Sequence, residues 1–463
     1  MINYFIFYLF IVNIIIITQE KSLPLILPFS TRFNKENMNK SNVIQMFINN
    51  NIIVNIEVGS NGQKIEMNIK NQKHSSFILS KSSHYHKKAM KFDENSTDTY
   101  KKLNNETKYY MYEFEYGIYS EDTFILPLEN KINLRVERFP FILAKTMWYD
   151  YQNYMGGCFG LSFISKTDDP TKTELIGQLH EKSLIKSTVF MLDYKDNFNG
   201  VFVMGNYLHE YNESYKKSEC LFMKAQRSSW KYPEWIINID KVENKKEEAI
   251  IQKNTYIYLY YELGVLCAPK NYYIYINSTF FHKYKEEGIC TEKNDKDPVA
   301  SFNKYYYIEC NKKGFNKESF PDLEFYNSET NYTFSFNYKD LFYEFEDKIY
   351  FLVIFPFLQT YTEYWYVGKP FFMKYKLFLD RDKKTIGFYP DNGKQPEKPS
   401  NNAKIIILVV VIVLLVVILA GVLYYFLWVK KSRKQRANEL DDDVDYIPHE
   451  DQTNNQNENE GVN

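Results

Sequence analysis

The feature that most constrains this chain is an apolar run near its C-terminus. The segment Ile405–Val429 has 25 residues without a charge, enough to cross a hydrocarbon core of about 30 Å as a helix. Five basic residues follow at once: Lys430, Lys431, Arg433, Lys434 and Arg436. Positive residues stay on the cytosolic side. The sequence therefore predicts a single-pass type I membrane protein with a transmembrane helix at 405–429 and a cytosolic tail at 430–463.

A second apolar run, Tyr4–Ile17, lies at the extreme N-terminus and is shorter. Its length is typical of the core of a signal peptide, so residues 1–18 are predicted to be one; an uncleaved anchor is the alternative. Both segments place the bulk of the chain in the lumen or outside the cell. The expected location is the secretory pathway, a vacuolar or lysosomal compartment, or the cell surface.

Glycosylation sequons agree with this topology. Asn-x-Ser/Thr triplets, which mark N-glycosylation acceptors, all precede the C-terminal apolar run and lie at Asn39, Asn95, Asn105, Asn212, Asn277 and Asn331. The formal net charge is -1, which gives no reason to expect a nucleic-acid partner.

The cysteines also fit an oxidising lumen, where some should pair. There are five: Cys158, Cys220, Cys267, Cys290 and Cys310. The odd count leaves at least one outside an intramolecular pair. The spacing contains no C-x-x-C and no His-rich cluster, so no metal and no cofactor are expected.

Between the two apolar runs the pattern predicts short strands joined by turns. The 41 Tyr and 36 Phe residues favour strands. Strands are expected at Asn51–Val58, Lys64–Ile69, Tyr110–Tyr116, Thr123–Leu128 and Phe139–Ala144, and short helices at Thr173–Lys186 and Thr279–Glu287. Residues 391–404 are rich in Pro, Asn and Lys and are predicted to form an extended linker. The expected fold class is all-β with a few short helices.

Several motifs, in order, resemble those of pepsin-like aspartic peptidases. The closing stretch, WYVGKPFFMKYKLFLDRDKKTIGF at Trp365–Phe388, is similar to the family pattern W-x-L-G-D-x-F-L-R-x-Y. The earlier ones are NIIVNIEVGSNGQ at Asn51–Gln63, Tyr116-Gly117, GCFGLSF at Gly157–Phe163, GVFVMG at Gly200–Gly205, WIINID at Trp235–Asp240 and FPDLEF at Phe320–Phe325.

The resemblance implies a bilobed fold. Residues 51–208 would form the N-terminal lobe and 209–390 the C-terminal lobe, after a short N-terminal or pro segment at 19–50. It also implies a second-lobe disulfide between Cys290 and Cys310, and buried, unreactive positions for Cys158 and Cys267. A monomer is expected.

The family reaction uses two carboxylates that share one proton around a water molecule. In the first lobe, counting forward from Gln63 puts the first aspartate position at Lys70, and counting back from Ser75-Ser76 puts it at Gln72. In the second lobe the corresponding position is Tyr260. Neither loop contains an Asp, so no catalytic residue is retained.

Other residues of the degenerate loops remain candidates for the cleft. They are His74, Ser75, Ser76 and Glu262, and an unusual His74–Glu262 acid–base pair is the one route to activity. Tyr116-Gly117 matches the family's flap, the hairpin that closes over substrate, and its tip is expected to be short.

We therefore expect a catalytically inactive, membrane-tethered pseudopeptidase that binds an extended peptide or a protein partner in its cleft. The alternatives are an aspartic-type endopeptidase with a rearranged site and a structural glycoprotein of the secretory pathway or cell surface. The first alternative depends on the fold alone, and the loop residues argue against it.

Overall fold

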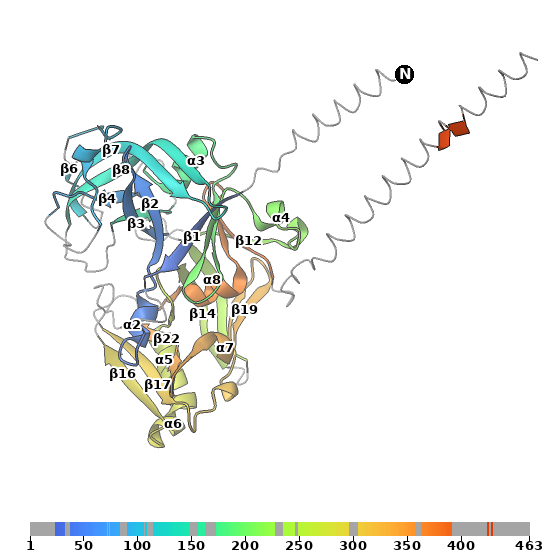
Figure 1. The fold of residues 1–463 in the computed structure, drawn as a ribbon. Coiled ribbons are helices and arrows are strands. Elements are labelled where there is room, and N and C mark those ends of the chain that lie inside the picture. Colours follow the sequence, from blue (N-terminus) through green and yellow to red (C-terminus); the bar gives the residue numbers. More distant parts are fainter. Residues whose placement is uncertain are drawn as a thin grey trace, which may run out of the picture. The chain divides into compact units, whose positions relative to one another are not determined.

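The structure, a computed structural model, describes residues 24–32, 38–71, 73, 75–83, 90–105, 107–108, 114–147, 156–162, 173–226, 235–245, 249–295, 304–356, 363–390, 424–425 and 427–428. The chain divides into two compact units, Met1–Asn392 and Gly393–Asn463. All strands named below belong to the first unit, which Figure 1 draws as two groups of strands.

The described strands form two sheets, which confirms the expected mostly-β class. We call the part that carries the larger sheet the first lobe. Its sheet runs in the order β12-β25-β24-β10-β11-β1-β2-β3-β9-β4-β8-β7-β5, with β6 paired to β7. The strands are β1 (Leu25–Thr31), β2 (Ile52–Val58), β3 (Gln63–Lys70), β4 (Phe77–Leu79), β5 (Lys101–Lys102), β6 (Thr107–Lys108), β7 (Phe114–Pro127), β8 (Asn133–Met147), β9 (Gly157–Gly160), β10 (Val189–Tyr194), β11 (Asn199–Met204), β12 (Leu221–Lys224), β24 (Phe378–Asp380) and β25 (Thr385–Phe388).

The second lobe carries the smaller sheet, in the order β19-β18-β13-β14-β23-β15-β22-β17-β21-β20, with β16 paired to β17. Its strands are β13 (Ile236–Asn244), β14 (Ala249–Leu259), β15 (Leu266–Cys267), β16 (Cys290–Asp295), β17 (Tyr305–Asn311), β18 (Leu323–Asn327), β19 (Tyr332–Phe336), β20 (Phe342–Phe345), β21 (Lys348–Phe351), β22 (Val353–Pro356) and β23 (Trp365–Val367).

The described helices are short. They are α2 (Val43–Ile48), α3 (Leu175–Glu181), α4 (Leu208–Tyr211), α5 (Lys270–Ile276), α6 (His282–Glu286), α7 (Tyr338–Leu341) and α8 (Lys369–Tyr375), with single turns η2 (Glu94–Ser96), η3 (Lys217–Glu219), η4 (Asn277–Phe281) and η5 (Lys317–Ser319). The helix expected at Thr173–Lys186 is present as α3. It ends early because Ser183 adopts a left-handed backbone conformation with φ of 57°.

Strand pairing joins distant parts of the chain into the first-lobe sheet. β1 lies in the segment expected to be a short N-terminal extension, yet it pairs along its length with β11. β24, from the end of the first unit, pairs with β10. The first-lobe sheet therefore uses residues from both ends of this unit.

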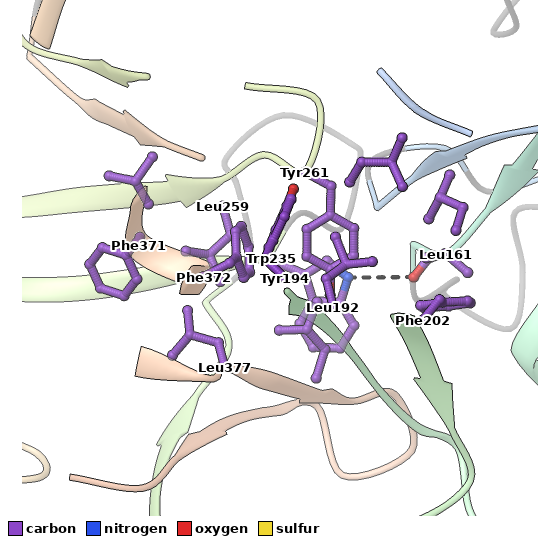
Figure 2. Close-up of a cluster of buried hydrophobic side chains, with 14 of the residues drawn as sticks. Leu161, Leu192, Tyr194, Phe202, Trp235, Leu259, Tyr261, Phe371, Phe372 and Leu377 are labelled. Carbon is purple, nitrogen blue, oxygen red and sulfur yellow. Dashed lines mark hydrogen bonds between the residues drawn. The ribbon is translucent and has the colours of Figure 1, made fainter. Parts of the chain in front are cut away.

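One hydrophobic core extends across both lobes. Figure 2 shows Leu161, Leu192 and Phe202 of the first lobe beside Trp235, Leu259 and Tyr261 of the second. The Trp235 indole Nε1 donates to the Leu161 carbonyl oxygen at 3.4 Å. Because these side chains are almost fully buried, they hold the two loops of the candidate site at fixed positions.

The predicted membrane span can be compared with the structure only at its end. Of the segment 405–429, Tyr424, Tyr425, Leu427 and Trp428 are described, and the rest lies outside the described residues. Among the helices that the structure describes, none is long and apolar enough to cross a membrane. The predicted signal peptide (1–18), linker (391–404) and tail (430–463) also lie outside the described residues.

Candidate functional site

The two lobes repeat one arrangement of four strands. In the first lobe, β3 is parallel to β9, β9 is antiparallel to β4, and β4 is parallel to β8. In the second lobe, β14, β23, β15 and β22 have the same three relations in the same order. Lys70 ends β3, and Tyr260 directly follows β14. The repeat therefore makes these two residues equivalent, which agrees with the forward count from Gln63.

Asn71 joins the two loops. Its side-chain Nδ2 donates to the Leu259 carbonyl oxygen at 2.8 Å, and its Oδ1 accepts from the Tyr261 backbone N–H at 3.2 Å. Asn71 is 0% exposed. In the family pattern, Thr or Ser hydroxyls hold the loops together, and here one amide makes both bonds. Asn71 was not among the sequence-predicted site residues; its position directly after Lys70 could have indicated it.

A second asparagine, from the segment before β2, also contacts the second loop of the site. Asn50 Nδ2 lies 3.2 Å from the Tyr194 hydroxyl oxygen and 3.5 Å from the Tyr261 carbonyl oxygen. Burial raises the pKa of both the Tyr194 and the Tyr261 hydroxyls above their usual value. Both phenols are therefore neutral at physiological pH, and neither supplies a negative charge to the site.

The two aspartate-equivalent positions differ in burial. Lys70 is buried, with 9% of its surface exposed, whereas Tyr260 is half-buried. The Tyr260 ring makes an edge contact with Tyr366, at 5.2 Å between ring centroids. The site thus has an amine side chain at the end of β3 and a phenol at the equivalent position after β14.

The other predicted site residues are only partly brought together. Ser75 and Ser76 are buried, and the Ser76 N–H lies 3.3 Å from the Thr173 carbonyl oxygen. Glu262 is half-buried in the second loop. Gln72 and His74 lie outside the described residues, so the His74–Glu262 pair stays a prediction. Within the described part of the chain, no cluster of His, Cys, Asp or Glu could hold a metal ion.

The flap region departs from the expected arrangement. We expected a hairpin tip directly after Tyr116-Gly117, but β7 continues from Phe114 to Pro127. Gly117 pairs with Thr107 of β6 and with Ala144 of β8. β6, which precedes Tyr116 in the chain, therefore pairs with β7 at Tyr116-Gly117.

The second-lobe side of the site is covered by α2. Of its six residues, Val43, Ile44, Met46, Phe47 and Ile48 are buried, in one cluster with Tyr258, Leu263, Val265 and Tyr366. The Gly264 N–H donates to the Phe47 carbonyl oxygen at 2.6 Å. A Cβ on Gly264 would lie 2.6 Å from this oxygen, so the contact requires glycine. From the sequence, this segment was predicted only as part of a short N-terminal or pro segment at 19–50.

Lys369 lies where α2 meets both lobes. It is 3% exposed, and its Nζ donates to the Asn197 carbonyl oxygen at 2.8 Å. The same Nζ is 4.9 Å from the centre of the Phe47 ring and 5.9 Å from that of Phe198. Burial lowers the pKa of Lys369 to about 7, and the charge of Asp196 opposes this shift. The family pattern W-x-L-G-D has Asp at this position, and that mismatch was the available signal.

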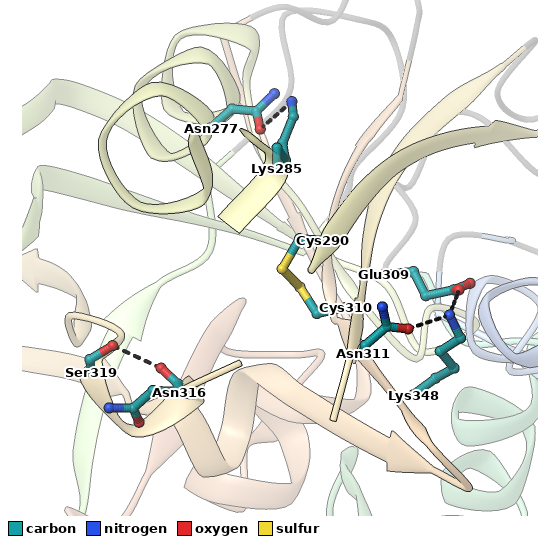
Figure 3. The surroundings of a disulfide bond; sticks show 9 residues. All are labelled: Asn277, Lys285, Cys290, Glu309, Cys310, Asn311, Asn316, Ser319 and Lys348. Atoms are coloured by element: carbon teal, nitrogen blue, oxygen red, sulfur yellow. Dashed lines mark hydrogen bonds and ion pairs between the residues drawn. A yellow bond between two sulfur atoms is a disulfide. The ribbon is translucent and has the colours of Figure 1, made fainter. Parts of the chain in front are cut away.

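The predicted Cys290–Cys310 disulfide is present, between paired residues of β16 and β17 (Figure 3). Cys158 and Cys267 are each 0% exposed, as expected for buried hydrophobic positions. Cys220 is also buried, and burial raises the pKa of its thiol to about 12. A thiol with that pKa is protonated and unreactive at neutral pH.

The six sequon asparagines differ in accessibility. Asn39, Asn95, Asn105 and Asn331 are exposed, and Asn212 is half-buried. Asn277 is half-buried, and its Nδ2, the atom that would carry a glycan, donates to Glu292 at 2.6 Å. Lys285 donates to the Asn277 Oδ1 at 3.1 Å (Figure 3). A glycan on the Asn277 Nδ2 would replace one of its two hydrogens, so the sugar would have to fit beside the bond to Glu292.

Comparison with known proteins agrees with this geometry. Residues 52–390 match the family of eukaryotic aspartyl proteases, which is more than half of the chain. No curated protein matches the chain as a relative. The matched region includes every described strand except β1, both loops of the candidate site and the disulfide. The chain belongs to the eukaryotic aspartyl protease family.

Proposed function

We propose that this chain is a catalytically inactive, membrane-tethered member of its family that binds an extended peptide or protein partner between its lobes. The observation that carries the proposal is the Asn71 bridge. It holds the two loops together as the family reaction requires, while Lys70 and Tyr260 stand at the positions of the carboxylates. The scaffold of the site is kept without its catalytic groups.

The chemistry argues against peptide-bond hydrolysis. The family mechanism needs one ionised carboxylate as the base toward water and one protonated carboxyl group as the acid toward the peptide carbonyl. Neither a lysine nor a tyrosine side chain can replace a carboxyl group in such a pair. Glu262 supplies one carboxylate, whereas the family mechanism uses two that share one proton.

Binding remains available to such a site. Aromatic side chains with hydroxyl groups offer large apolar contact area together with hydrogen bonds. Tyr116 and Tyr260, on the two lobes, are half-buried and still reach the surface. A polypeptide passing between the lobes would contact both rings.

The test uses the full-length chain, purified in mild detergent, with unfolded casein at acidic and neutral pH. We expect no cleavage that a general aspartic-peptidase inhibitor blocks, and measurable binding of labelled casein by fluorescence anisotropy. A Tyr116→Ala/Tyr260→Ala variant should bind roughly tenfold more weakly, a loss of about 1.4 kcal/mol. Tyr256→Ala, at an exposed tyrosine of β14, is the matched control. Inhibitor-sensitive cleavage that Glu262→Gln abolishes would refute the proposal in favour of a rearranged endopeptidase.

Membrane tethering and lumenal placement are part of the same proposal. They are supported by the apolar run 405–429 and the basic residues that follow it. Protease added to sealed vesicles from expressing cells should trim only the tail 430–463, and glycosidase should reduce the mass of the protected fragment. Digestion of both lobes in sealed vesicles would reverse the proposed topology.

A further inference from the structure

The hairpin formed by β18 and β19 carries one of the glycosylation sequons, Asn331-Tyr332-Thr333. Asn327 at the end of β18 pairs with Tyr332 at the start of β19. The loop 328–331 joins them, and the Asn331 N–H closes it by donating to the Ser328 carbonyl oxygen at 3.3 Å. Asn331 has a φ of 49°, in the left-handed region that asparagine adopts more readily than most residues. The backbone of the loop therefore fixes the point from which the Asn331 side chain starts.

Side-chain bonds hold this loop in one conformation. The Asn327 Oδ1 accepts from the Thr330 N–H at 2.9 Å and from the Thr330 hydroxyl at 2.8 Å. The Asn327 Nδ2 donates to the Asn238 carbonyl oxygen on β13 at 2.8 Å. Because both ends of this amide are bonded and Asn327 is 1% exposed, the loop is fixed to the sheet. A sugar on Asn331 would therefore leave the loop in a defined direction.

Tyr326 and Thr333 lie side by side on the face of the hairpin that points away from the core. They are direct partners in the antiparallel register, which places their Cβ atoms about 4.5–5.5 Å apart. Their chain neighbours Phe325 and Phe334 face the core and are each 0% exposed, whereas Tyr326 and Thr333 are half-buried. The hairpin thus presents a phenol ring and a methyl group at its surface, beside the glycosylation sequon.

The Asn331 side chain already reaches this surface. The Tyr326 hydroxyl donates to the Asn331 Oδ1 at 3.2 Å. The Asn331 Nδ2, the atom that would carry a glycan, makes no hydrogen bond to another residue in the part of the chain that the structure describes. At Asn277, by contrast, the Nδ2 donates to Glu292. Since Oδ1 and Nδ2 share one carbon atom, a sugar on the Asn331 Nδ2 starts beside the Tyr326 ring.

We propose that an N-glycan on Asn331 is part of the fold of the second lobe, with its first N-acetylglucosamine packed on the Tyr326 ring and the Thr333 methyl group. A pyranose ring in its chair form has a face of C–H groups. This face packs on an aromatic ring as an apolar surface does, while the sugar hydroxyls stay in water. The inference rests on the lumenal placement within the proposed function, because sequons are glycosylated in proteins of the secretory pathway.

The sugar should stabilise the hairpin locally. β19 stands at the end of the second-lobe sheet, where β18 is its neighbour. Pairs of side chains opposite each other on adjacent strands stabilise such a hairpin. A sugar over Tyr326 and Thr333 covers both members of one pair and removes their apolar surface from water. Without the sugar, β18 and β19 should therefore open more often.

The test measures amide hydrogen exchange of β18 and β19 in the full-length, glycosylated chain in mild detergent. Asn331→Asp removes the glycan, but it keeps an oxygen for the Tyr326 hydroxyl and a residue type that tolerates the left-handed backbone. We expect about fivefold faster exchange in this variant than in the unaltered chain. Asn39→Asp, which preserves the Asn39 Oδ1 bonds to Ser41, is the matched control and should exchange at the unaltered rate. Equal rates in all three chains would overturn the proposal.

Variants of Tyr326 show whether its ring is the partner of the sugar. Tyr326→Phe keeps the ring and loses the hydroxyl, so removal of the glycan should still speed exchange about fivefold in this background. In a Tyr326→Ser background, removal of the glycan should leave the exchange rate unchanged. A glycan effect of equal size in the Tyr326→Ser background would mean that the sugar acts without the ring, against the proposal.

Glycan trimming keeps the test valid if Tyr326→Ser does not fold. Endoglycosidase H cuts high-mannose glycans and leaves the first N-acetylglucosamine on each asparagine. The trimmed unaltered chain should still exchange about fivefold more slowly than the trimmed Asn331→Asp chain, because the remaining sugar is the one that packs on Tyr326. If trimming abolishes the difference, the outer sugars are responsible and the proposal is wrong.

Occupancy of the sequons separates this inference from the proposed function. Mass spectrometry of the purified chain should find a glycan on Asn331. If it finds glycans at other sequons and none at Asn331, the lumenal placement stands and this inference is wrong. If it finds none at any sequon, the proposed lumenal placement fails together with the inference.

Discussion

The two lobes have the same four-strand arrangement. They differ in the side chains on the face of these strands that points away from the shared core. In the first lobe, Asn68 on β3 pairs with Cys158 on β9. In the second lobe, the equivalent pair is Tyr258 on β14 and Tyr366 on β23, with ring centroids 5.1 Å apart. The neighbouring residues that face the shared core are apolar in both lobes. Alternate residues of each strand thus keep the apolar core in both lobes, while the residues between them differ from one lobe to the other.

The difference has a structural consequence. The aromatic face of the second lobe is covered by α2 from the chain's own N-terminal segment. Asn68 in the first lobe is 1% exposed, and neither of its amide atoms has a hydrogen-bond partner in the structure described. The second-lobe face is thus covered by apolar packing, whereas the first-lobe face contains a buried amide for which the described residues offer no hydrogen bond.

The largest expected effect is a loss of stability in the second lobe when its disulfide is removed. The Cys290–Cys310 disulfide closes a loop with a sequence separation of 20 in the second lobe. A Cys290→Ser/Cys310→Ser variant should lose about 3 kcal/mol, because the unfolded chain gains freedom. Chemical denaturation followed by hydrogen exchange should show the second lobe opening before the first. Cys220→Ser, outside the disulfide, is the control, and a uniform loss of protection in both lobes would mean that they unfold as one unit.

The next effect concerns the link between the lobes. Asn71→Ala would leave the Leu259 carbonyl oxygen and the Tyr261 N–H buried without their partner. Each such group costs about 1–3 kcal/mol. With both groups near the lower end of that range, the variant should lose about 2 kcal/mol in urea unfolding.

Asn71→Thr is the matched control for this link, since the family pattern uses a hydroxyl there. It should recover part of the loss, because a hydroxyl can both donate and accept. If Asn71→Ala is as stable as the unaltered chain, the two loops are held by the apolar core alone.

The sequence predicted the fold better than the site. Strand alternation was enough for the mostly-β class, and the family resemblance of the ordered motifs predicted the disulfide. The predicted division at residue 208 did not anticipate that β12, β24 and β25 join the first-lobe sheet. Counting left the first-lobe position open between Lys70 and Gln72, and the repeated strand arrangement is what favours Lys70. Asn71 and Lys369 were missed because their roles depend on contacts with residues more than 100 positions away, Leu259 and Asn197.

The position of α2 was missed for a similar reason. Its apolar run predicts burial but not the surface that it covers. The turn expected after Tyr116-Gly117 was misplaced because β7 continues through these residues, paired with β8 along its length.

A smaller effect tests the junction between α2 and the lobes. The pKa of Lys369 is lowered to about 7 from 10.5, so the unfolded chain binds one more proton than the folded chain between these values. The free energy of unfolding should then rise with pH across this window, by up to about 1.4 kcal/mol per pH unit from this group. Lys369→Met should remove that slope and be the more stable chain below pH 7.

Lys253→Met, at an exposed lysine of β14, is the control for this pH dependence. It should keep the slope of the unaltered chain in denaturation series run from neutral to alkaline pH. An unchanged slope in Lys369→Met would place the ammonium group in water rather than beneath Phe47.

The smallest expected effect is a change in stability when the buried Asn68 of the first lobe is replaced. Asn68→Leu replaces a buried amide without partners by an apolar side chain of similar size, so it should stabilise the chain by about 1 kcal/mol. Its second-lobe equivalent, Tyr258, already packs apolar surface there. If Asn68 contacts a ligand, the same variant should also bind casein more weakly, because the ligand's polar group would lose its partner. If the variant is more stable and binds casein as before, the ligand contacts the second lobe alone. If the variant is less stable, the Asn68 amide makes a hydrogen bond within the fold.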